Sequence, residues 1–327
     1  MTRLLVAIAL TCLLAAGCGE KEEKLSPGAP EKLELMLDWF PNADHAPIYA
    51  AQSGGHFEDV GLDVEIRQPP GDPAAPLKQV VAGRVDLAVS YEPEVLRARD
   101  KGLAVVAVGA LVQTPLTSII SLPGAGIRTA EDLDGKVVGT AGIDYQAAYL
   151  SAIAKKAGAR VEQRDVGFNL SAALLSRKVD AVLGAFWNYE GTDLRLRKRN
   201  PQIIRLEQAG VPTYDELVFV ANADREDDRI KRFVAALERG TDDLRRDPGA
   251  GLKGLLDANR DLDPELQRAV VDVTLPLFGP PRGKPFGWQE PKEWNAFAKW
   301  MRDNELLENA IDARGAFTNE YLPGEGP

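Results

Sequence analysis

The sequence predicts an α/β protein built from two similar blocks with a cleft between them. Short apolar segments alternate with helical segments of about ten residues, which is typical of parallel βαβ units and open sheets with helices on both faces. The alternation begins near residue 32, restarts near residue 117, and is followed by a late apolar segment at 217–223. A chain of 327 residues, 45% of them hydrophobic, is long enough for two such domains.

The first block contains alternating strand and helix candidates whose helices end at glycines. Gly54–Gly55, Gly83 and Gly102 stand where helices are expected to terminate. In chain order the predicted segments are strand 32–37, helix 46–57, strand 62–69, helix 73–83, strand 85–91, helix 92–102 and strand 103–111.

The second block repeats this order and is joined to the first by two extended crossings. The segment after residue 223 is mostly helical, starting with 228–248. Two α/β blocks with two crossings predict a bilobed protein, in which ligands bind outside the carboxyl ends of the strands. The predicted segments are strand 136–142, helix 144–159, strand 161–167, helix 170–178 and strand 179–191, which runs into a loop.

Residues 1–17 are predicted to be a lipoprotein signal peptide. An apolar stretch at 4–14 follows one arginine, and Ala15-Ala16-Gly17-Cys18 resembles a bacterial lipobox, in which Cys18 carries the lipid. The alternative is a plain secretory signal cut near this position. Residues 18–31 are polar with Pro and Gly, which predicts a flexible tether. We therefore expect an exported domain, anchored by lipid in the periplasm or on the outer face of the cytoplasmic membrane.

Composition argues against several functional classes. With 49 acidic and 39 basic residues the net charge is −10, whereas nucleic-acid binders normally present a basic face. Cys12 and Cys18 both lie in the predicted leader, and the only histidines are His45 and His56. No motif for a catalytic serine, a phosphate loop, a dinucleotide or a metal follows a strand. We expect a binding protein without cofactor or metal, and no enzyme.

The run "LDWFPNADHAPIYAAQ" (37–52) follows the first predicted strand and is the first candidate site. Trp39 would stand at the carboxyl end of this strand, where its flat indole could form a stacking wall for a planar ligand. The alternative is core packing of Trp39, with Asp38 as a helix cap. His45 is either a ligand donor or a structural residue.

A second concentration of aromatic and acidic residues, "AFWNYEG" (185–191), follows a strand of the other block. An ionised Glu190 between Trp187 and Tyr189 suits a planar ligand with N–H donors, because a carboxylate accepts two hydrogen bonds side by side. The alternative is an aromatic hinge with a solvated glutamate.

Three further strand ends or helix starts carry candidate side chains. Tyr91 follows a strand of the first block, with helix capping as the alternative role for Glu92. Asp144 stands at the start of a helix, where capping is the expected role and an anionic ligand would be repelled. Tyr145 is expected to line the cleft.

Four segments together resemble the NMT1/THI5-like family, and within it the substrate-binding lipoproteins of ABC transporters that capture thiamine pyrimidine precursors. They are "LDWFPNADHAPIYAAQSGGHFEDVGLDVEI", "GDPAAPLKQVVAGRVDLAVSYEPE", "FWNYEGTDLRLR" and "GVPTYDELVFVANAD". The resemblance implies a type II periplasmic-binding-protein fold, with two Rossmann-like lobes, a hinge and a central cleft. It also implies delivery of an aminopyrimidine (hydroxymethylpyrimidine or formylaminopyrimidine type) to an ABC permease.

In pyrimidine-binding relatives aromatic side chains sandwich the ring and an acid pairs with its amino group and adjacent ring nitrogen. The resemblance assigns the acid to Glu190 or Asp38, and stacking to Trp39, Trp187 or Tyr189. Riboflavin or a sulfonate is the alternative ligand. The fungal enzymes of the family use a lysine-bound cofactor and a Cys-rich motif. The predicted mature chain lacks the Cys-rich motif.

The complete prediction assigns residues 32–118 and 219–327 to the first lobe and 119–218 to the second. The candidate ligand-binding residues are Asp38, Trp39, Asn42, His45, Tyr49, Tyr91, Tyr145, Trp187, Tyr189 and Glu190.

Overall fold

The computed structural model describes residues 29–71, 75–225, 227–309 and 312–324. The predicted signal peptide, Cys18 and most of the predicted tether lie outside these residues. No described helix is long and apolar enough to cross a membrane.

Strands and helices alternate through the first two thirds of the chain, and helices dominate the rest. The strands are β1 (Glu31–Met36), β2 (Leu62–Arg67), β3 (Leu87–Ser90), β4 (Val105–Val112), β5 (Thr117–Ser121), β6 (Lys136–Thr140), β7 (Val161–Asp165), β8 (Ala181–Phe186), β9 (Gln202–Arg205) and β10 (Leu217–Asn222). The helices are α1 (Ala46–Ser53), α2 (His56–Asp59), α3 (Ala75–Val81), α4 (Glu92–Asp100), α5 (Asp144–Ala157), α6 (Leu170–Leu175), α7 (Glu190–Leu196), α8 (Asp228–Arg246), α9 (Pro248–Ala258), α10 (Pro264–Thr274) and α11 (Pro291–Asp303). Short 3-10 turns include η1 (Ala43–His45).

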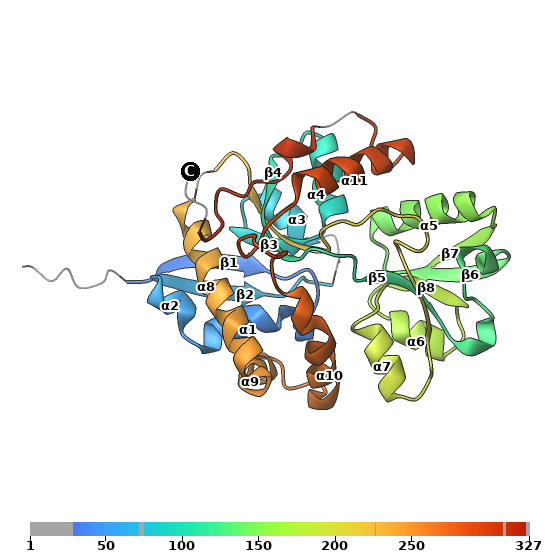
Figure 1. Ribbon diagram of the computed structural model, residues 1–327, viewed down its shortest axis with the longest axis horizontal. Coiled ribbons are helices and arrows are strands. Elements are labelled where there is room, and N and C mark those ends of the chain that lie inside the picture. The colour runs from blue at the N-terminus through green and yellow to red at the C-terminus, as the bar shows by residue number, and fades with distance from the viewer. Residues whose placement is uncertain (1–28, 72–74, 226, 310–311, 325–327) are drawn as a thin grey trace, which may run out of the picture.

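The strands form two five-stranded sheets, one in each lobe (Figure 1). The first lobe contains the sheet β2-β1-β3-β10-β4, and the second lobe contains β7-β6-β8-β5-β9. The predicted α/β class and bilobed arrangement are confirmed. Each sheet is mixed rather than parallel, because β10 runs antiparallel to β3 and β4, and β5 runs antiparallel to β8 and β9. These two strands follow the crossings and therefore enter their sheets from the cleft side.

The chain crosses between the lobes at 113–116 and again at 206–216, between β4 and β5 and between β9 and β10. The predicted lobe boundaries at 118/119 and 218/219 fall inside β5 and β10. Strand β9 was not predicted. The C-terminal helices return to the first lobe, where α8 and α9 pack on α1 and α11 packs on α4 (Figure 1).

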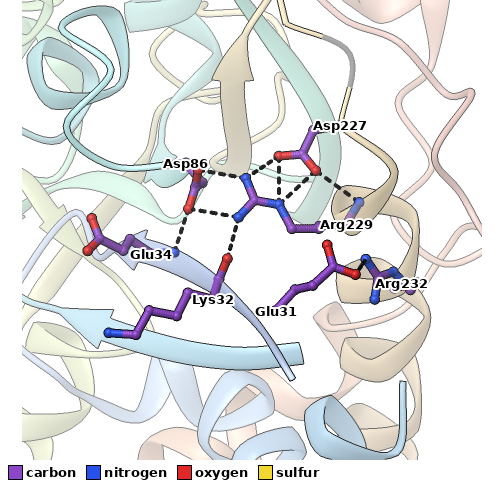
Figure 2. A network of polar contacts seen from close by, with 7 residues as sticks. All are labelled: Glu31, Lys32, Glu34, Asp86, Asp227, Arg229 and Arg232. Carbon is purple, nitrogen blue, oxygen red and sulfur yellow. Dashed lines mark hydrogen bonds and ion pairs between the residues drawn. The ribbon is translucent and has the colours of Figure 1, made fainter. Parts of the chain in front are cut away.

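A polar network lies at the end of the first sheet where β1 and β3 begin (Figure 2). Arg229 at the start of α8 pairs with Asp227 (2.6 Å) and Asp86 (2.8 Å) and donates to the carbonyl of Lys32. Asp86 in turn accepts from the backbone N–H of Glu34 (2.8 Å). The network therefore ties α8 to the beginnings of β1 and β3.

Candidate functional site

Side chains from both lobes meet where four parallel strands end. Asp38 and Trp39 follow β1, and Tyr91 follows β3. In the second lobe, Tyr145 lies in the first turn of α5 after β6, and Glu190 opens α7 after β8. This is the position at which open α/β sheets bind ligands.

These side chains line a pocket of about 490 Å³, a volume that includes space open to solvent. Its lining residues are Asp38, Trp39, Asn42, Asp44, His45, Tyr91, Ile143, Tyr145, Gln146, Leu170, Gly184, Phe186, Tyr189 and Glu190. All candidate residues predicted from the sequence line it except Tyr49 and Trp187. We call this pocket the interlobe cavity.

Tyr49 and Trp187 lie elsewhere for identifiable reasons. Tyr49 is on the buried face of α1 and borders a separate surface groove beside Gln52. Trp187 donates from its indole Nε1 to the carbonyl of Pro115 (3.1 Å), and the Arg205 guanidinium stacks over its ring at 3.6 Å. Phe186 is the last residue of β8 and lines the cavity, whereas Trp187 begins the turn after β8 and is held against the crossing by its bond to Pro115.

Asp38 is held by two side-chain partners on one side of the cavity. The Tyr91 hydroxyl donates to Oδ2 (2.6 Å), and His45 Nε2 lies 2.8 Å from Oδ1. The backbone N–H of Asn42 donates to His45 Nδ1 (3.3 Å), so a neutral His45 ring carries its proton on Nε2 and donates to Asp38. Burial raises the pKa of Asp38, but the bonds from His45 and Tyr91 outweigh it and hold this pKa below its usual value.

Both carboxylate oxygens of Asp38 thus have protein partners, which makes this side chain an organiser of His45 and Tyr91. It is not the helix cap considered as an alternative. The cap of η1 is Asn42, whose side chain accepts from the backbone N–H of Asp44 (2.9 Å).

Two other carboxyl groups point at the cavity from opposite lobes. Glu190 Oε2 accepts from the backbone N–H of Phe186 (2.7 Å), and burial raises the pKa of Glu190 to about 7. Asp44 Oδ1 accepts from Asn188 Nδ2 (2.5 Å), and burial raises the pKa of Asp44 to about 7 as well. Among the described residues that line the cavity there is no lysine or arginine. The site therefore offers acceptors, and it suits a ligand rich in N–H donors.

Aromatic rings from both lobes meet beside these acids. Trp39, which lines the cavity, contacts Phe168 of the second lobe edge to face, with ring centroids 3.9 Å apart. Phe40 stands next to both rings and is partly exposed. Tyr189 lines the cavity from the second lobe. Flat faces for a planar ligand are thus available beside the carboxyl groups.

Six lining residues were missed in the sequence: Asp44, Ile143, Gln146, Leu170, Gly184 and Phe186. Asp44 lies within the run already singled out, and its acidic type was the available signal. Gly184 has φ +103, and a Cβ there would lie 2.5 Å from Gln146 Nε2, so only glycine allows Gln146 to approach. Gln146 and Leu170 have no local signal because tertiary packing brings their helices to the cavity.

The capping role predicted for Asp144 is wrong, and so is the capping role considered as the alternative for Glu92. The residue before α5 is Ile143, which provides no side-chain cap, and Asp144 instead contacts Arg97 across the cleft (3.4 Å). Glu92 is fully buried and accepts from the backbone N–H of Asp215 (2.7 Å). Both helices start without a side-chain cap.

More buried acids lie behind the cavity where the two crossings meet. Glu216 accepts from the backbone N–H groups of Leu116 and Thr117 (2.7 Å each) and from the Tyr214 hydroxyl (3.0 Å). It therefore joins one crossing to the other. Burial raises the pKa of Glu216 to about 7. Within the described part of the chain, no group of three or more His, Cys, Asp or Glu residues could hold a metal ion.

Comparison with known proteins identifies the family. A family model described as NMT1/THI5 like matches residues 42–250. The chain belongs to the NMT1/THI5-like family. The resemblance seen in the sequence is thereby confirmed.

Relatives within the NMT1/THI5-like family differ in what their names describe. The chain is 37% identical to a Haemophilus influenzae protein named for thiamine biosynthesis, covering 86% of this chain and 90% of that protein. It is 32% identical to the formylaminopyrimidine-binding protein of Halalkalibacterium halodurans, covering 96% and 98% respectively. At 24% identity it also matches a Legionella pneumophila 4-amino-5-hydroxymethyl-2-methylpyrimidine phosphate synthase, covering 89% and 92%.

Solved structures establish the fold of this family member. The alkanesulfonate-binding protein SsuA of Xanthomonas axonopodis pv. citri superposes with a TM-score of 0.67 at 20% identity, covering 89% of this chain and 99% of that one. A Candida albicans protein with the generic periplasmic binding protein fold gives a TM-score of 0.63 at 16% identity, covering 91% and 98%. The predicted periplasmic-binding-protein fold is confirmed.

Proposed function

We propose that this protein is the solute-binding component of an ABC importer and that its ligand is an aminopyrimidine precursor of thiamine. The observation that carries this proposal is the composition of the interlobe cavity. Glu190 and Asp44 offer carboxyl oxygens beside aromatic rings, and none of the described lining residues is a lysine or an arginine. The family and the formylaminopyrimidine-binding relative support this proposal.

The recognition chemistry pairs Glu190 with the amidine-like edge of the ring. An amino group and the adjacent protonated ring nitrogen would donate two parallel bonds to the carboxylate, each worth about 1.5–3 kcal/mol when one partner is charged. Trp39 and Tyr189 would contact the ring faces, and stacking on one aromatic adds about 0.5–1.5 kcal/mol beyond burial. Phe186, which faces the cavity, takes the place that the sequence suggested for Trp187.

The direct test is calorimetric titration of the purified protein with four solutes in parallel: hydroxymethylpyrimidine, formylaminopyrimidine, riboflavin and an alkanesulfonate. We expect saturable binding of an aminopyrimidine and none of the sulfonate, because Asp44 and Glu190 would repel an anion. Native mass spectrometry of freshly purified protein should show a mass increment that matches the bound pyrimidine. Binding of the sulfonate alone, or of none of the four, would reject the ligand assignment.

A riboflavin ligand and a pyrimidine-synthesising enzyme remain the competing functions. Riboflavin would co-purify with a yellow colour and dominate the titration series. The synthase relatives motivate the enzyme alternative, for which incubation with pyridoxal phosphate should produce a Schiff-base absorbance. We expect no such absorbance, because none of the described residues that line the cavity is a lysine.

We further propose that Cys18 anchors the protein to a membrane and that the two lobes present the loaded ligand to a permease. Replacing Cys18 by alanine should release the protein from the membrane fraction while leaving ligand binding unchanged. Persistent membrane association of this variant would contradict the lipid anchor.

A further inference from the structure

Helix α10 of the first lobe reaches the second lobe without lining the cavity, and it contacts the start of α7 (Figure 1). Its residues Gln267 and Thr274 are seven positions apart, which is two helical turns, so both lie on one face. Both side chains are buried, although they are polar. A buried polar residue is tolerated when it has partners, and here these partners lie partly in the other lobe.

Gln267 joins the two walls of the cavity. Its Oε1 accepts from the backbone N–H of Ala43 in η1 (2.8 Å), and its Nε2 donates to the Tyr189 hydroxyl of the second lobe (3.1 Å). Ala43 stands between Asn42 and Asp44, which line the cavity from the first lobe, and Tyr189 lines it from the second. One side chain thus connects both walls from behind.

Asn188 makes the reciprocal connection from the second lobe. Its Nδ2 donates to Thr274 Oγ1 (2.7 Å) and to Asp44 Oδ1 (2.5 Å), both in the first lobe. The Thr274 hydroxyl uses its own proton on the carbonyl of Val270 (2.7 Å), which leaves its oxygen free to accept. The buried Oδ1 of Asn188 accepts no bond from the described residues, so bonds to the first lobe orient this amide.

We propose that Gln267 and Thr274 form an interlobe clasp that holds the lobes together before a ligand arrives and positions Tyr189 and Asp44 for binding. Bonds between side chains of opposite lobes exist only when the lobes are closed, so each bond shifts the population towards the closed state. Apparent affinity scales with the fraction of binding-competent protein. The clasp therefore sets the affinity of the cavity through residues that touch no ligand. Its effect on affinity rests on the proposed function, whereas its effect on closure does not.

The first experiment measures closure without any ligand. Spin labels at Ser151→Cys on α5 and Lys231→Cys on α8, both exposed positions, report the interlobe distance when Cys12 and Cys18 are replaced by serine. We expect a closed population in the parent protein and longer distances in Gln267→Ala and Thr274→Val. Thr274→Ser retains the hydroxyl acceptor and should retain the parent distances.

Arg268→Ala provides the matched control, because this residue pairs with Asp272 on the exposed face of the same helix. Its distances should equal those of the parent. A parent that is fully open without ligand would overturn the proposal. Parent-like distances in both Gln267→Ala and Thr274→Val would also overturn it. Thr274→Val preserves the shape of the side chain, so its comparison with Thr274→Ser isolates the hydrogen bond from packing.

The second experiment measures affinity for hydroxymethylpyrimidine in the same variants. Loss of one neutral hydrogen bond should weaken binding by about two- to tenfold. Thr274→Ser and Arg268→Ala should bind like the parent. If the parent binds no pyrimidine, the proposed function fails while the distance measurement still tests the clasp. Longer distances with unchanged affinity would reject the role of the clasp in binding.

Discussion

Buried and half-buried acids have different kinds of partner at the two ends of the first sheet. At the end where the parallel strands begin, Asp86 and Asp227 are both paired with Arg229 (Figure 2). At the end where they finish, Asp44 has only the neutral donor Asn188, and Glu92 accepts a backbone N–H. Glu190 of the second lobe faces the same space. One end thus has compensated charge and the other has carboxyl groups without a cation.

The difference separates a contribution to stability from a contribution to binding. A carboxylate paired with arginine is stabilised in its ionised form, and its pairing stabilises the fold. A buried carboxyl without a cation destabilises the folded state when ionised, unless an incoming donor compensates it. We infer that the cavity end of the sheet is less stable without ligand, because its buried acids have no cationic partner. At the other end, the acids are already paired with Arg229.

The largest expected effect is on binding, in the variant Glu190→Gln. Removing the acid that would pair with the amidine-like edge should weaken aminopyrimidine binding about 10- to 100-fold, equivalent to about one charge-assisted bond, because the amide of glutamine still offers one acceptor oxygen. The free energy of unfolding at pH 8 should stay equal or rise, because a neutral amide replaces a carboxyl whose pKa burial raises to about 7. Calorimetric titration and chemical denaturation measure the two quantities.

Glu94→Gln is the matched control for this binding effect. Burial raises the pKa of Glu94 to about 7 too, yet its side chain accepts from Ser90 and does not line the interlobe cavity. Its affinity should therefore match that of the parent. Equal losses in Glu94→Gln and Glu190→Gln would mean that general electrostatics, rather than a direct contact, governs binding.

Arg229→Met should show the opposite pattern at the other end of the sheet. It leaves Asp86 and Asp227 without their cation and removes the donor to Lys32. Since the group is half-buried, we expect a loss of about 1–3 kcal/mol in the free energy of unfolding and unchanged ligand affinity. Arg246→Met, an exposed arginine on the same helix, should change stability by less than about 0.5 kcal/mol. A weakened ligand affinity in Arg229→Met would contradict the inference that this end of the sheet contributes to stability and not to binding.

The stability of the ligand-free protein should fall as the pH rises from about 5 to 8. The pKa of both Asp44 and Glu190 is raised by burial to about 7, above the ordinary value near 4, so the folded state binds more protons in this window. The stabilisation that results from these two raised pKa values is fully present below pH 4 and is lost as the pH rises past 7. These two groups predict a decline on the order of 5 kcal/mol between pH 5 and pH 8, because each unit of raised pKa is worth about 1.4 kcal/mol. Thermal or chemical denaturation at several pH values across this range measures the decline.

Asp227 at the Arg229 end should not contribute to this slope. Burial raises the pKa of Asp227, but hydrogen bonds from Arg229 outweigh it and keep this pKa below its usual value, outside the window. The double variant Asp44→Asn/Glu190→Gln should therefore reduce the slope, and the remaining slope belongs to Glu94 and Glu216, whose pKa burial also raises to about 7. Arg229→Met should shift the profile without changing its slope. A double variant with the parent slope would assign the titration to other groups, such as Glu94 or Glu216.

Sequence reasoning located the cavity where local pattern and topology coincide. Asp38, Tyr91 and Glu190 each follow a strand, and parallel strands deliver such residues to one edge of a sheet. It failed at Trp187, because this residue begins the turn after β8 and its indole bonds to the crossing at Pro115. The resemblance to a family placed this tryptophan among the stacking residues, while the structure turns Phe186 towards the cavity.

Contacts between distant segments could not be predicted. Gln267 lies 224 residues from Ala43, and the pattern of α10 gives no sign that a polar residue on its buried face reaches the other lobe. The antiparallel direction of β5 and β10 was missed for the same reason, since a crossing strand enters whichever sheet position is open. Side-chain type and strand order indicate which residues stand at the end of a strand. Hydrogen bonds between the two lobes depend on the folded arrangement and cannot be predicted from them.

The smallest expected effect tests whether any ion pair at the Arg229 end stabilises the fold or only the half-buried one. Glu31 pairs with Arg232 (2.7 Å) on the same face, but the Glu31 side chain is 59% exposed. Arg232 also donates to the carbonyl of Val60 (3.1 Å), a bond that survives removal of the acid. Glu31→Ala should therefore lower the free energy of unfolding by less than about 0.5 kcal/mol, and the difference should vanish in high salt. A loss comparable to that of Arg229→Met would show that exposed ion pairs stabilise this end of the sheet as much as the half-buried guanidinium of Arg229 does.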